Sequence, residues 1–235
     1  MKSVAARYQH YIVHRYGVCL MLILTSIVVQ IAAPDTEGGR VLVVVLYGLT
    51  LISAMRAADS PRVLVRIARV VVVVLILASA GLSLGTPDVG EHATRITTLI
   101  LVVIAPVVIV RGLIRHGLEE GVVTVQTMFG VLCLYLLLGL AFASTYNVVG
   151  ALEAAPFFVE GKNTTSNFLF FSFSTMTTTG YGNLIPAEGP GKALATLESL
   201  LGQVYLVTVV ATIVGNLGRK TKIKARPKKR PAKSR

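Results

Sequence analysis

Residues 177–182 read Thr-Thr-Thr-Gly-Tyr-Gly, and the interpretation of the whole chain starts from this run. Two glycines separated by one tyrosine follow three threonines. Glycine adopts positive φ without the steric cost that a Cβ imposes. A backbone that alternates between left- and right-handed conformations aims successive carbonyl oxygens to one side. A cation that leaves water needs such oxygens in place of its hydration shell. The run alone is equally compatible with a turn in a loop, so its surroundings must decide.

The segment before the run is apolar and too short to cross a bilayer. Residues 166–177 read Ser-Asn-Phe-Leu-Phe-Phe-Ser-Phe-Ser-Thr-Met-Thr. A transmembrane helix needs about 20 residues, so this segment predicts a re-entrant helix. The negative end of its dipole would favour a cation. Non-helical backbone at membrane depth is tolerated only where protein or water surrounds it, which favours an ion pathway over a simple turn.

The run and its flanks resemble the pore of the potassium channel family, in its prokaryotic single-pore form. The family filter reads T-V-G-Y-G, and a threonine replaces the valine here. The resemblance covers about residues 122–218. It implies that the carbonyls of 178–181 and one threonine hydroxyl bind potassium, while the tyrosine side chain packs behind. The implied filter and potassium-binding residues are Thr178, Thr179, Gly180, Tyr181 and Gly182.

Support for the filter is expected from Ser174, Thr177, Asn183 and Glu198. Many family members have an aspartate at the position of Asn183, and some pair it with a glutamate at the position of Ser174. Both carboxyls are absent here, so the hydrogen-bond brace behind the filter must differ. Glu198 is ionisable and lies in an apolar segment, which makes it functional by default. We expect Ser174 or Thr177 to be its partner.

The last apolar segment, residues 193–217, resembles the inner helix of these channels. Gly202 stands near the position of a flexible glycine in the family, although close helix packing would also explain a small residue there. The expected apolar constriction at the inner mouth consists of Val210, Ile213 and Val214. The predicted hinge and gate are these four residues.

The composition is that of an integral membrane protein. The chain is 54% hydrophobic and 14% charged, and its mean hydropathy is +0.72. The predicted fold class is all-α integral membrane, with six transmembrane helices, a re-entrant pore helix and a selectivity filter, assembled as a homotetramer. The spans are expected at residues 17–33, 41–55, 63–84, 96–114, 122–149 and 193–217. The expected domains are a four-helix membrane domain (1–120), a pore domain (121–218) and a basic cytoplasmic tail (219–235).

The basic residues favour one orientation. Of 23 lysines and arginines, 19 fall on the cytoplasmic side when both termini are placed there. Ten of them lie in residues 219–235, where they predict contact with anionic lipid and not with nucleic acid. Cleavage of the first apolar segment as a signal peptide is the alternative to this topology. We expect a multi-pass protein of the plasma membrane.

The first four apolar segments match the number of helices in a voltage sensor but lack its charged residues. A sensor needs arginines spaced through its fourth helix, and residues 96–110 contain none. Arg62, Arg66 and Arg69 belong to the third segment and are interpreted as interfacial anchors. Cys19 and Cys133 are expected to be core residues. His10 and His14 are four residues apart but have no acidic partner, so a metal pair is not expected.

The predicted function is passive, potassium-selective conduction without enzymatic chemistry, without a cofactor other than the permeant ion, and without voltage gating. Two alternatives remain. One is a non-selective cation channel of the same fold, which Tyr181 argues against. The other is a non-conducting membrane scaffold or regulatory subunit that retains a pore-like segment. A reversal potential separates the first alternative from a potassium channel, and an ion-flux assay separates the second.

Overall fold

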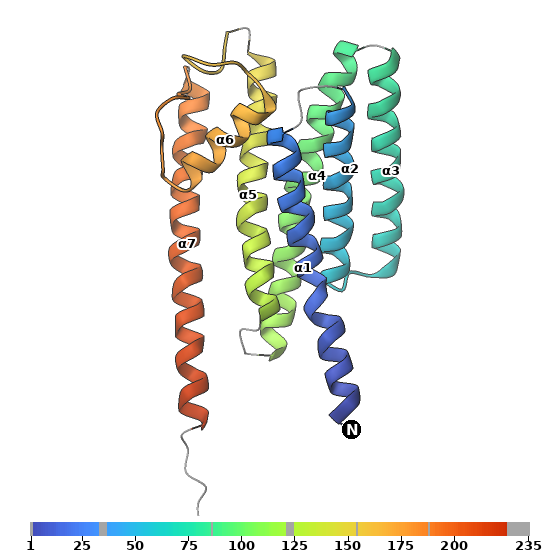
Figure 1. The fold of residues 1–235 in the computed structure, drawn as a ribbon, viewed down its shortest axis with the longest axis vertical. Helices are drawn as coiled ribbons and strands as arrows, with labels where there is room; N and C mark the ends of the chain where they lie inside the picture. The colour runs from blue at the N-terminus through green and yellow to red at the C-terminus, as the bar shows by residue number, and fades with distance from the viewer. Residues whose placement is uncertain are drawn as a thin grey trace, which may run out of the picture.

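The computed structural model describes residues 2–32, 37–85, 87–120, 125–153, 155–187 and 189–224, and within them every regular element is a helix (Figure 1). Its one β-contact in this part is an isolated bridge between Phe158 and Pro186. The helices are α1 (Lys2–Ala32), α2 (Glu37–Ala57), α3 (Arg62–Gly85), α4 (Pro87–Glu120), α5 (Val125–Leu152), α6 (Thr165–Met176) and α7 (Gly189–Lys224). The all-α class is thereby confirmed.

Among the described residues, four helices are long and apolar enough to cross a membrane. They are the segments Gly38–Ala57, Arg62–Gly81, Gly90–Ile114 and Thr127–Leu152. The apolar part of α1, Tyr16–Ala32, is shorter, and α7 is not among the four. The structure therefore shows four candidate spans where the sequence predicted six, and membrane crossing by α1 and α7 stays a prediction. The predicted continuity of residues 63–84 is confirmed, because α3 is one helix.

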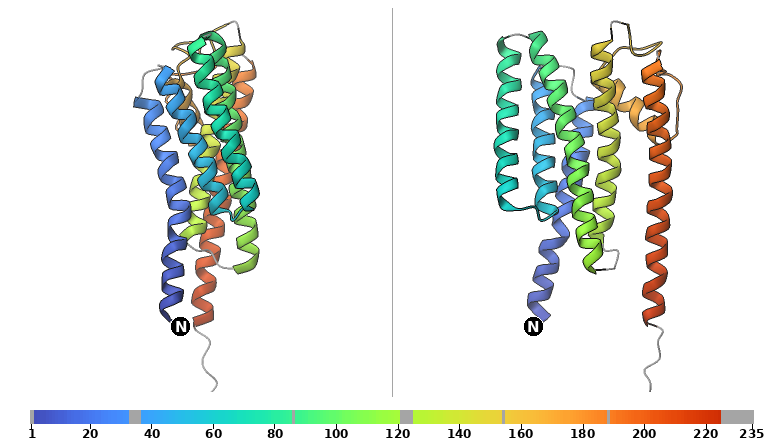
Figure 2. Two further views of the ribbon diagram at one scale, coloured as in Figure 1. Left: turned by 90° about the vertical axis from the view of Figure 1, so that its right-hand side faces the viewer. Right: turned by 180° about the vertical axis from the view of Figure 1, so that it is seen from behind.

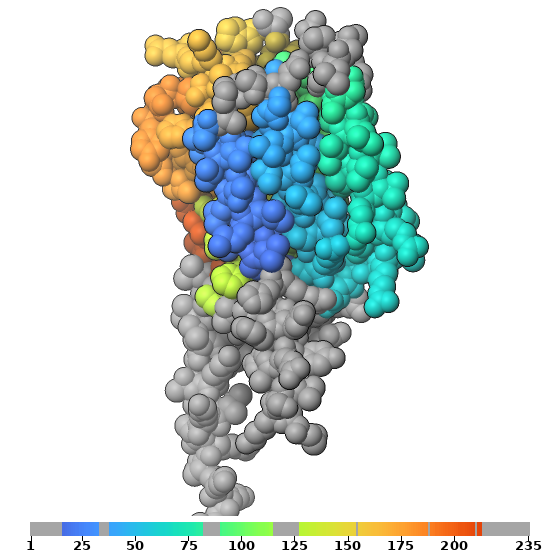
Figure 3. Space-filling model, turned by 45° about the vertical axis from the view of Figure 1, so that its right-hand side comes forward, coloured from blue at the N-terminus to red at the C-terminus, as the bar shows by residue number. Residues whose placement is uncertain are grey.

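The helices form a row in which α3 and α7 are the two ends (Figures 1 and 2). Helix α3 packs against α2 and α4, and α2 and α4 also contact each other. Helix α5 lies against α4 and α1. Helix α7 contacts only α5 and α6 within the described part of the chain. Figure 3 shows α1, α2 and α3 side by side on one face, with the α6–α7 region at the edge.

Two buried clusters hold this arrangement. The larger one is mostly aliphatic and joins α1–α5 and one residue of α6, with Ile23, Leu101 and Leu137 among its fully buried members. Cys19 and Cys133 lie in it as buried thiols, as expected. The smaller cluster is aromatic and packs α6 against α5 and the loop after it; it consists of Tyr146, Phe157, Phe158, Phe168 and Phe171. Burial of apolar side chains in two clusters leaves α6 fixed between α5 and α7.

Several helix faces remain exposed and apolar. On α3 the exposed residues include Val70, Val74 and Leu77. On α7 a stripe of exposed side chains repeats at helical spacing, which places it on one face. It consists of Leu197, Leu200, Leu201, Val204 and Val207. Large exposed apolar surfaces mark contact with lipid or with another protein.

Candidate functional site: a pore helix and its carbonyl run

Helix α6 is the short helix that the sequence predicted, shifted by one residue. It begins after Thr164, whose hydroxyl accepts a hydrogen bond from the backbone N–H of Asn167 at 3.2 Å. This is a common N-cap arrangement, because it satisfies one of the free N–H groups of the first turn. The helix has 12 residues and a length of about 18 Å. It is therefore too short to cross a hydrocarbon core of about 30 Å.

The backbone after α6 alternates in handedness. Positive φ occurs at Thr178 (56°), Gly180 (54°) and Gly182 (80°), with Thr179 and Tyr181 between them on the negative side. The sequence predicted this conformation for the two glycines. It did not predict it for Thr178, where a β-branched residue at positive φ is a genuine outlier. Such strain costs of order 1–3 kcal/mol, persists only where the surroundings hold it, and clusters at functional sites.

The N–H groups of the first part of the run, as far as Gly180, donate back to α6. Those of Thr179 and Gly180 both donate to the carbonyl of Ser174, at 2.8 and 3.2 Å. Within the part of the chain that the structure describes, no group donates to the carbonyls of residues 178–182. These five residues are exposed in the single chain. The run therefore combines N–H groups that are bonded to α6 as far as Gly180 with a row of exposed carbonyls that accept no hydrogen bond within the described chain, which is the chemistry of a cation ligand set.

The side chains of the run are held by a few contacts. Thr177 donates to the Phe173 carbonyl at 2.7 Å, and its hydroxyl lies 2.8 Å from that of Thr179. The Tyr181 ring stacks on that of Phe170 in α6, with centroids 5.3 Å apart. The aromatic spacer expected behind the run thus rests on α6.

Glu198 of α7 is fully buried and binds two hydroxyls. Tyr146 of α5 donates to its Oε2 at 2.7 Å, and the Ser172 hydroxyl of α6 lies 2.5 Å from its Oε1. The carboxyl thereby connects three helices. The predicted partners, Ser174 and Thr177, are wrong, although the predicted element, α6, is right. Ser174 is two residues from Ser172 and so lies about 200° around the helix.

The brace behind the run differs from the carboxyl pair of the resembling family, as the sequence indicated. The Ser174 hydroxyl donates to the carbonyl of Phe171 in its own helix, at 3.0 Å. Asn183 is exposed. After the run the chain is instead tied to the loop that follows α5. Val159 donates to the carbonyl of Ile185, and Ala187 to that of Phe157, both at 2.9 Å.

Gly202 lies where α7 approaches the end of α6. A Cβ built on it would clash with the carbonyl oxygen of Met176 and would lie 2.8 Å from that residue's Cγ. The packing interpretation of this glycine is therefore supported by contact, and its role as a hinge stays a prediction. The predicted gate residues Val210, Ile213 and Val214 lie in α7, and their side chains are outside the described part of the structure.

Gln203 of α7 is a residue that the sequence analysis missed. Its amide Nε2 donates to the Thr178 hydroxyl at 2.9 Å. The available signal was an amide side chain within the apolar stretch from Leu200 to Val210. Gly202, the residue before Gln203, has no side chain, so α7 can lie close to the end of α6. This close packing brings the Gln203 amide within hydrogen-bond distance of Thr178.

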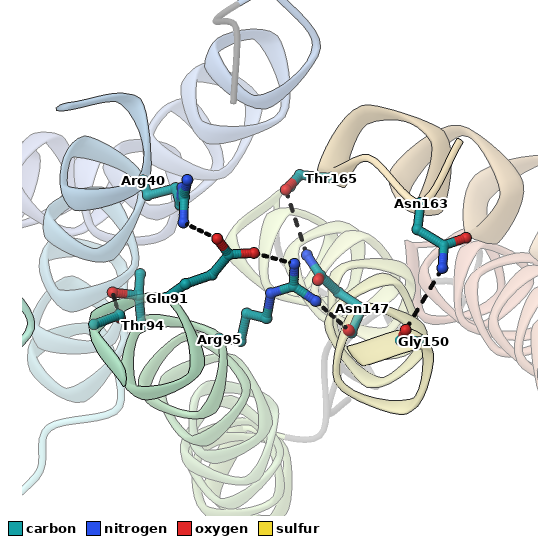
Figure 4. Close-up of polar contacts among 9 residues, drawn as sticks. Arg40, Glu91, Thr94, Arg95, Asn147, Gly150, Asn163 and Thr165 are labelled. Atoms are coloured by element: carbon teal, nitrogen blue, oxygen red, sulfur yellow. Dashed lines mark hydrogen bonds and ion pairs between the residues drawn. The ribbon is translucent and has the colours of Figure 1, made fainter. Parts of the chain in front are cut away.

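A polar crevice joins the first four helices to the pore region (Figure 4). Arg40 of α2 binds Glu91 of α4 at 2.7 Å, and Arg95 binds the other oxygen of the same carboxylate. Arg95 also donates to the Asn147 carbonyl at 3.2 Å, and the Asn147 amide lies 3.4 Å from the hydroxyl of Thr165 at the start of α6. These groups line a cavity of about 270 Å³. The i,i+4 spacing of Glu91 and Arg95 was the sequence signal for this network.

The basic residues of the first half are placed in helices. Arg62, Arg66 and Arg69 occupy the first two turns of α3, and Arg62 and Arg66 are exposed. Arg111 is exposed near the C-terminal end of α4. The side chains of His10, His14 and Arg115 are outside the described residues. So is most of the basic tail, since α7 ends at Lys224.

Comparison with known proteins agrees with the pore geometry. Residues 130–219 match the family model described as Ion channel. No curated protein and no solved structure matches the chain. The match begins in α5 and ends in α7, so it includes α6, the carbonyl run, Glu198 and Gln203, and leaves α1–α4 outside. The resemblance stated from the run agrees with this match: residues 130–219 are similar to an ion channel domain, and together with the long apolar helices this supports a membrane protein.

Proposed function

We propose that the chain is a subunit of a potassium-selective channel that conducts passively through the carbonyls of residues 178–181. One observation carries this proposal. Positive φ at alternate residues coincides with a row of carbonyls to which nothing in the described chain donates. Potassium is the ion that a T-x-G-Y-G carbonyl ladder selects. No covalent chemistry follows from this arrangement.

A single chain supplies one strand of carbonyls and therefore an incomplete shell. Four copies around an axis would complete it, which makes a homotetramer the proposed assembly. The exposed stripe on α7 supports this, because a helix that contacts two neighbours among the described residues leaves apolar surface for another copy. In detergent, the protein mass after correction for bound detergent should be four times 25.1 kDa. A stable conducting dimer would contradict the assembly.

The proposed topology places both termini in the cytoplasm of a plasma-membrane protein. The basic tail then faces anionic lipid, and the carbonyl run opens on the outer side. Gating by voltage is not proposed, because the exposed arginines of α3 and α4 lie near helix ends and the middle of α4 contains none.

The decisive experiment is ion flux from purified protein in liposomes. Potassium and rubidium should pass far better than sodium, and barium should block. Gly180→Ala should abolish selective flux, because a Cβ disfavours the positive φ of that residue. Gly189→Ala is the matched control, since a Cβ there meets no atom within 4 Å and its φ is not in the positive range.

The two competing functions predict different results. Equal sodium and potassium flux would identify a non-selective cation channel. The absence of any flux from a correctly assembled tetramer would indicate a non-conducting scaffold or regulatory subunit. Either result would exclude potassium-selective conduction by this chain.

A further inference from the structure

The crevice between the four-helix region and the pore region is a cavity that the proposed conduction pathway does not use (Figure 4). It has a volume of about 270 Å³ and is lined by residues of α1, α2, α4 and α5 and by the first residue of α6. One water molecule takes about 30 Å³ of liquid volume. The crevice therefore has room for a ligand group of several heavy atoms.

The charged side chains of the crevice carry one excess positive charge. Arg40 and Arg95 both bind Glu91, which is the only acidic residue among the described residues that line the cavity. Four of the 23 basic residues lie on the outer side in the proposed topology, and helix packing brings two of them to this one carboxylate. The side chain of Arg95 is only 22% exposed. Partly buried charges are costly without a full counter-charge, so the crevice favours an anion.

Arg95 has donors left for such an anion. Its Nη1 donates to the Asn147 carbonyl and its Nη2 to Glu91. A guanidinium has five N–H groups, so further N–H groups of Arg95 have no acceptor within the part of the chain that the structure describes.

Ser144 supplies a second kind of donor from the opposite wall. It lines the same cavity on α5, three residues before Asn147, so the two residues share one face of the helix. Its side chain is buried, with 9% exposed, and among the described residues no group forms a hydrogen bond with its hydroxyl. A buried hydroxyl without a partner is unfavourable. An oxygen of a ligand in the crevice would satisfy it.

The start of α6 adds to the same preference. Thr165 is the first residue of this helix and lines the cavity. The N-terminal end of a helix dipole is positive and favours an anion nearby. The Thr165 hydroxyl also lies 3.4 Å from the Asn147 amide. A ligand in the crevice would therefore contact both the four-helix region and the pore helix.

We propose that the crevice binds a phosphate group, held by the guanidinium groups of Arg40 and Arg95 and by the Ser144 hydroxyl. The planar fork of a guanidinium matches the geometry of phosphate oxygens. Donors from α2, α4 and α5 suit an anion with several oxygens better than a monatomic one. A soluble phosphate compound and a phospholipid headgroup both carry this group. The inference goes beyond the proposed conduction, because binding requires neither a current nor potassium.

The test measures the thermal unfolding midpoint of the full-length protein in detergent at constant ionic strength. One titration replaces sodium chloride by sodium phosphate. The other adds short-chain phosphatidylglycerol and compares it with a diacylglycerol of the same chains, which lacks the phosphate. A rise of the midpoint with sodium phosphate would identify a site open to soluble phosphate. A rise with phosphatidylglycerol alone would identify a headgroup site, and no rise in either titration would overturn the proposal.

Two variants locate the binding in the crevice. Ser144→Ala and Arg40→Gln should each raise the dissociation constant for the stabilising ligand by about tenfold, because each removes a bond to a charged group. Thr145→Val is the matched control for the serine, since Thr145 bonds to the Ala141 carbonyl of its own helix. Lys192→Gln is the control for the arginine, since Lys192 is exposed outside the crevice. Equal dissociation constants in all four variants would overturn the site.

Glu91→Gln separates binding from a purely structural role of the ion pairs. It removes the carboxylate that competes for both arginines, so phosphate should bind more tightly although the protein without phosphate becomes less stable. Loss of a structural ion pair alone would lower the midpoint without tightening binding. Weaker phosphate binding in this variant would contradict the proposal. If the variant does not fold, Ser144→Ala and its control decide alone.

Discussion

The four-helix region and the pore region are packed from different side chains. All eight phenylalanines of the chain lie between residues 129 and 173, and α1–α4 contain none. The larger core, to which α1–α4 contribute, is mostly aliphatic, whereas five aromatic rings, two of them on α6 itself, pack together at α6. Ring pairs such as Phe157–Phe158 lie 4.9 Å apart in edge geometry, which adds stabilisation beyond the area buried.

This difference follows from the lengths of the helices that each region must keep in position. Helices α2–α5 are each long enough to span a membrane and are fixed along their length by their neighbours. Helix α6 has 12 residues and leads directly into strained backbone. A short helix has few contacts of its own, so rigid rings with two rotatable bonds are an effective way to fix its position. The position of α6 in turn sets that of the carbonyl run.

The largest expected effect comes from the aromatic cluster. Phe157→Ala should lower the free energy of unfolding by about 3–5 kcal/mol and should reduce potassium selectivity, because Phe157 packs on Phe158 and Phe168 beside α6. Leu101→Ala in the buried aliphatic core is the control. It should lower the melting temperature of the protein but keep the reversal potential. Loss of selectivity in both variants would remove the distinction between the regions.

An intermediate effect is expected at Glu198. The Ser172 hydroxyl lies 2.7 Å from the Gly139 carbonyl and 2.5 Å from Glu198. A serine has one hydrogen, so bonds to both partners require the carboxyl to donate the second one. Glu198→Gln supplies an amide donor and an acceptor for Tyr146 and should retain flux. Glu198→Leu removes the acceptor of the buried Tyr146 hydroxyl and one of the two partners of Ser172, and should cost about 1–3 kcal/mol.

Thermal unfolding and flux of the two Glu198 variants check this prediction. A glutamine variant that is as damaged as the leucine variant would show that the negative charge matters, and that the hydrogen-bond arrangement drawn from Ser172 is wrong. The two regions would then differ in a further way, because the pore region would contain a buried charge and the four-helix region would not.

The smallest effect is expected in the four-helix region. Replacement of Arg62, Arg66 and Arg69 by glutamine should leave the voltage dependence of the current nearly unchanged. These residues start α3, and Arg62 and Arg66 are exposed. A charge that crosses the whole field contributes about 2.3 kcal/mol per 100 mV, so residues that stay at one edge contribute little. A steep conductance–voltage curve that flattens on substitution would make α3 a sensor and overturn the proposed topology.

The positions of the pore elements could be predicted from local signals. The apolar segment before the run was short, and Thr177–Gly182 had a spacing that only a few structures use, so α6 and the positive φ of both glycines followed. The number of transmembrane helices was harder to predict, because several uncharged segments are near 15 residues long, which is close to the minimum length of a membrane span. By that criterion the structure supports four spans, and the others remain to be tested.

The contacts between helices could not be predicted from the same signals. Whether Ser172 or Ser174 meets Glu198 depends on the rotation of α6, and each residue turns a helix by about 100°. The bond from Gln203 to Thr178 depends on how closely α7 approaches Met176. The positive φ of Thr178 contradicts local preference, and the hydroxyl of this residue accepts a hydrogen bond from Gln203 on another helix. Such features arise from packing, which one sequence without its structure does not specify.

The carbonyl row also determines how the proposed binding site would respond to mutation. Apart from the one threonine hydroxyl, its ligands are peptide oxygens, which every amino acid carries, so a substitution elsewhere in the row does not delete a ligand as it would in a site of carboxylates or imidazoles. It acts only through the torsion angles. Thr179, at negative φ, should therefore exchange with valine, which has nearly the same shape, at little cost. Gly180 and Gly182 should tolerate almost no replacement, so the information for ion recognition resides in conformational freedom rather than in functional groups.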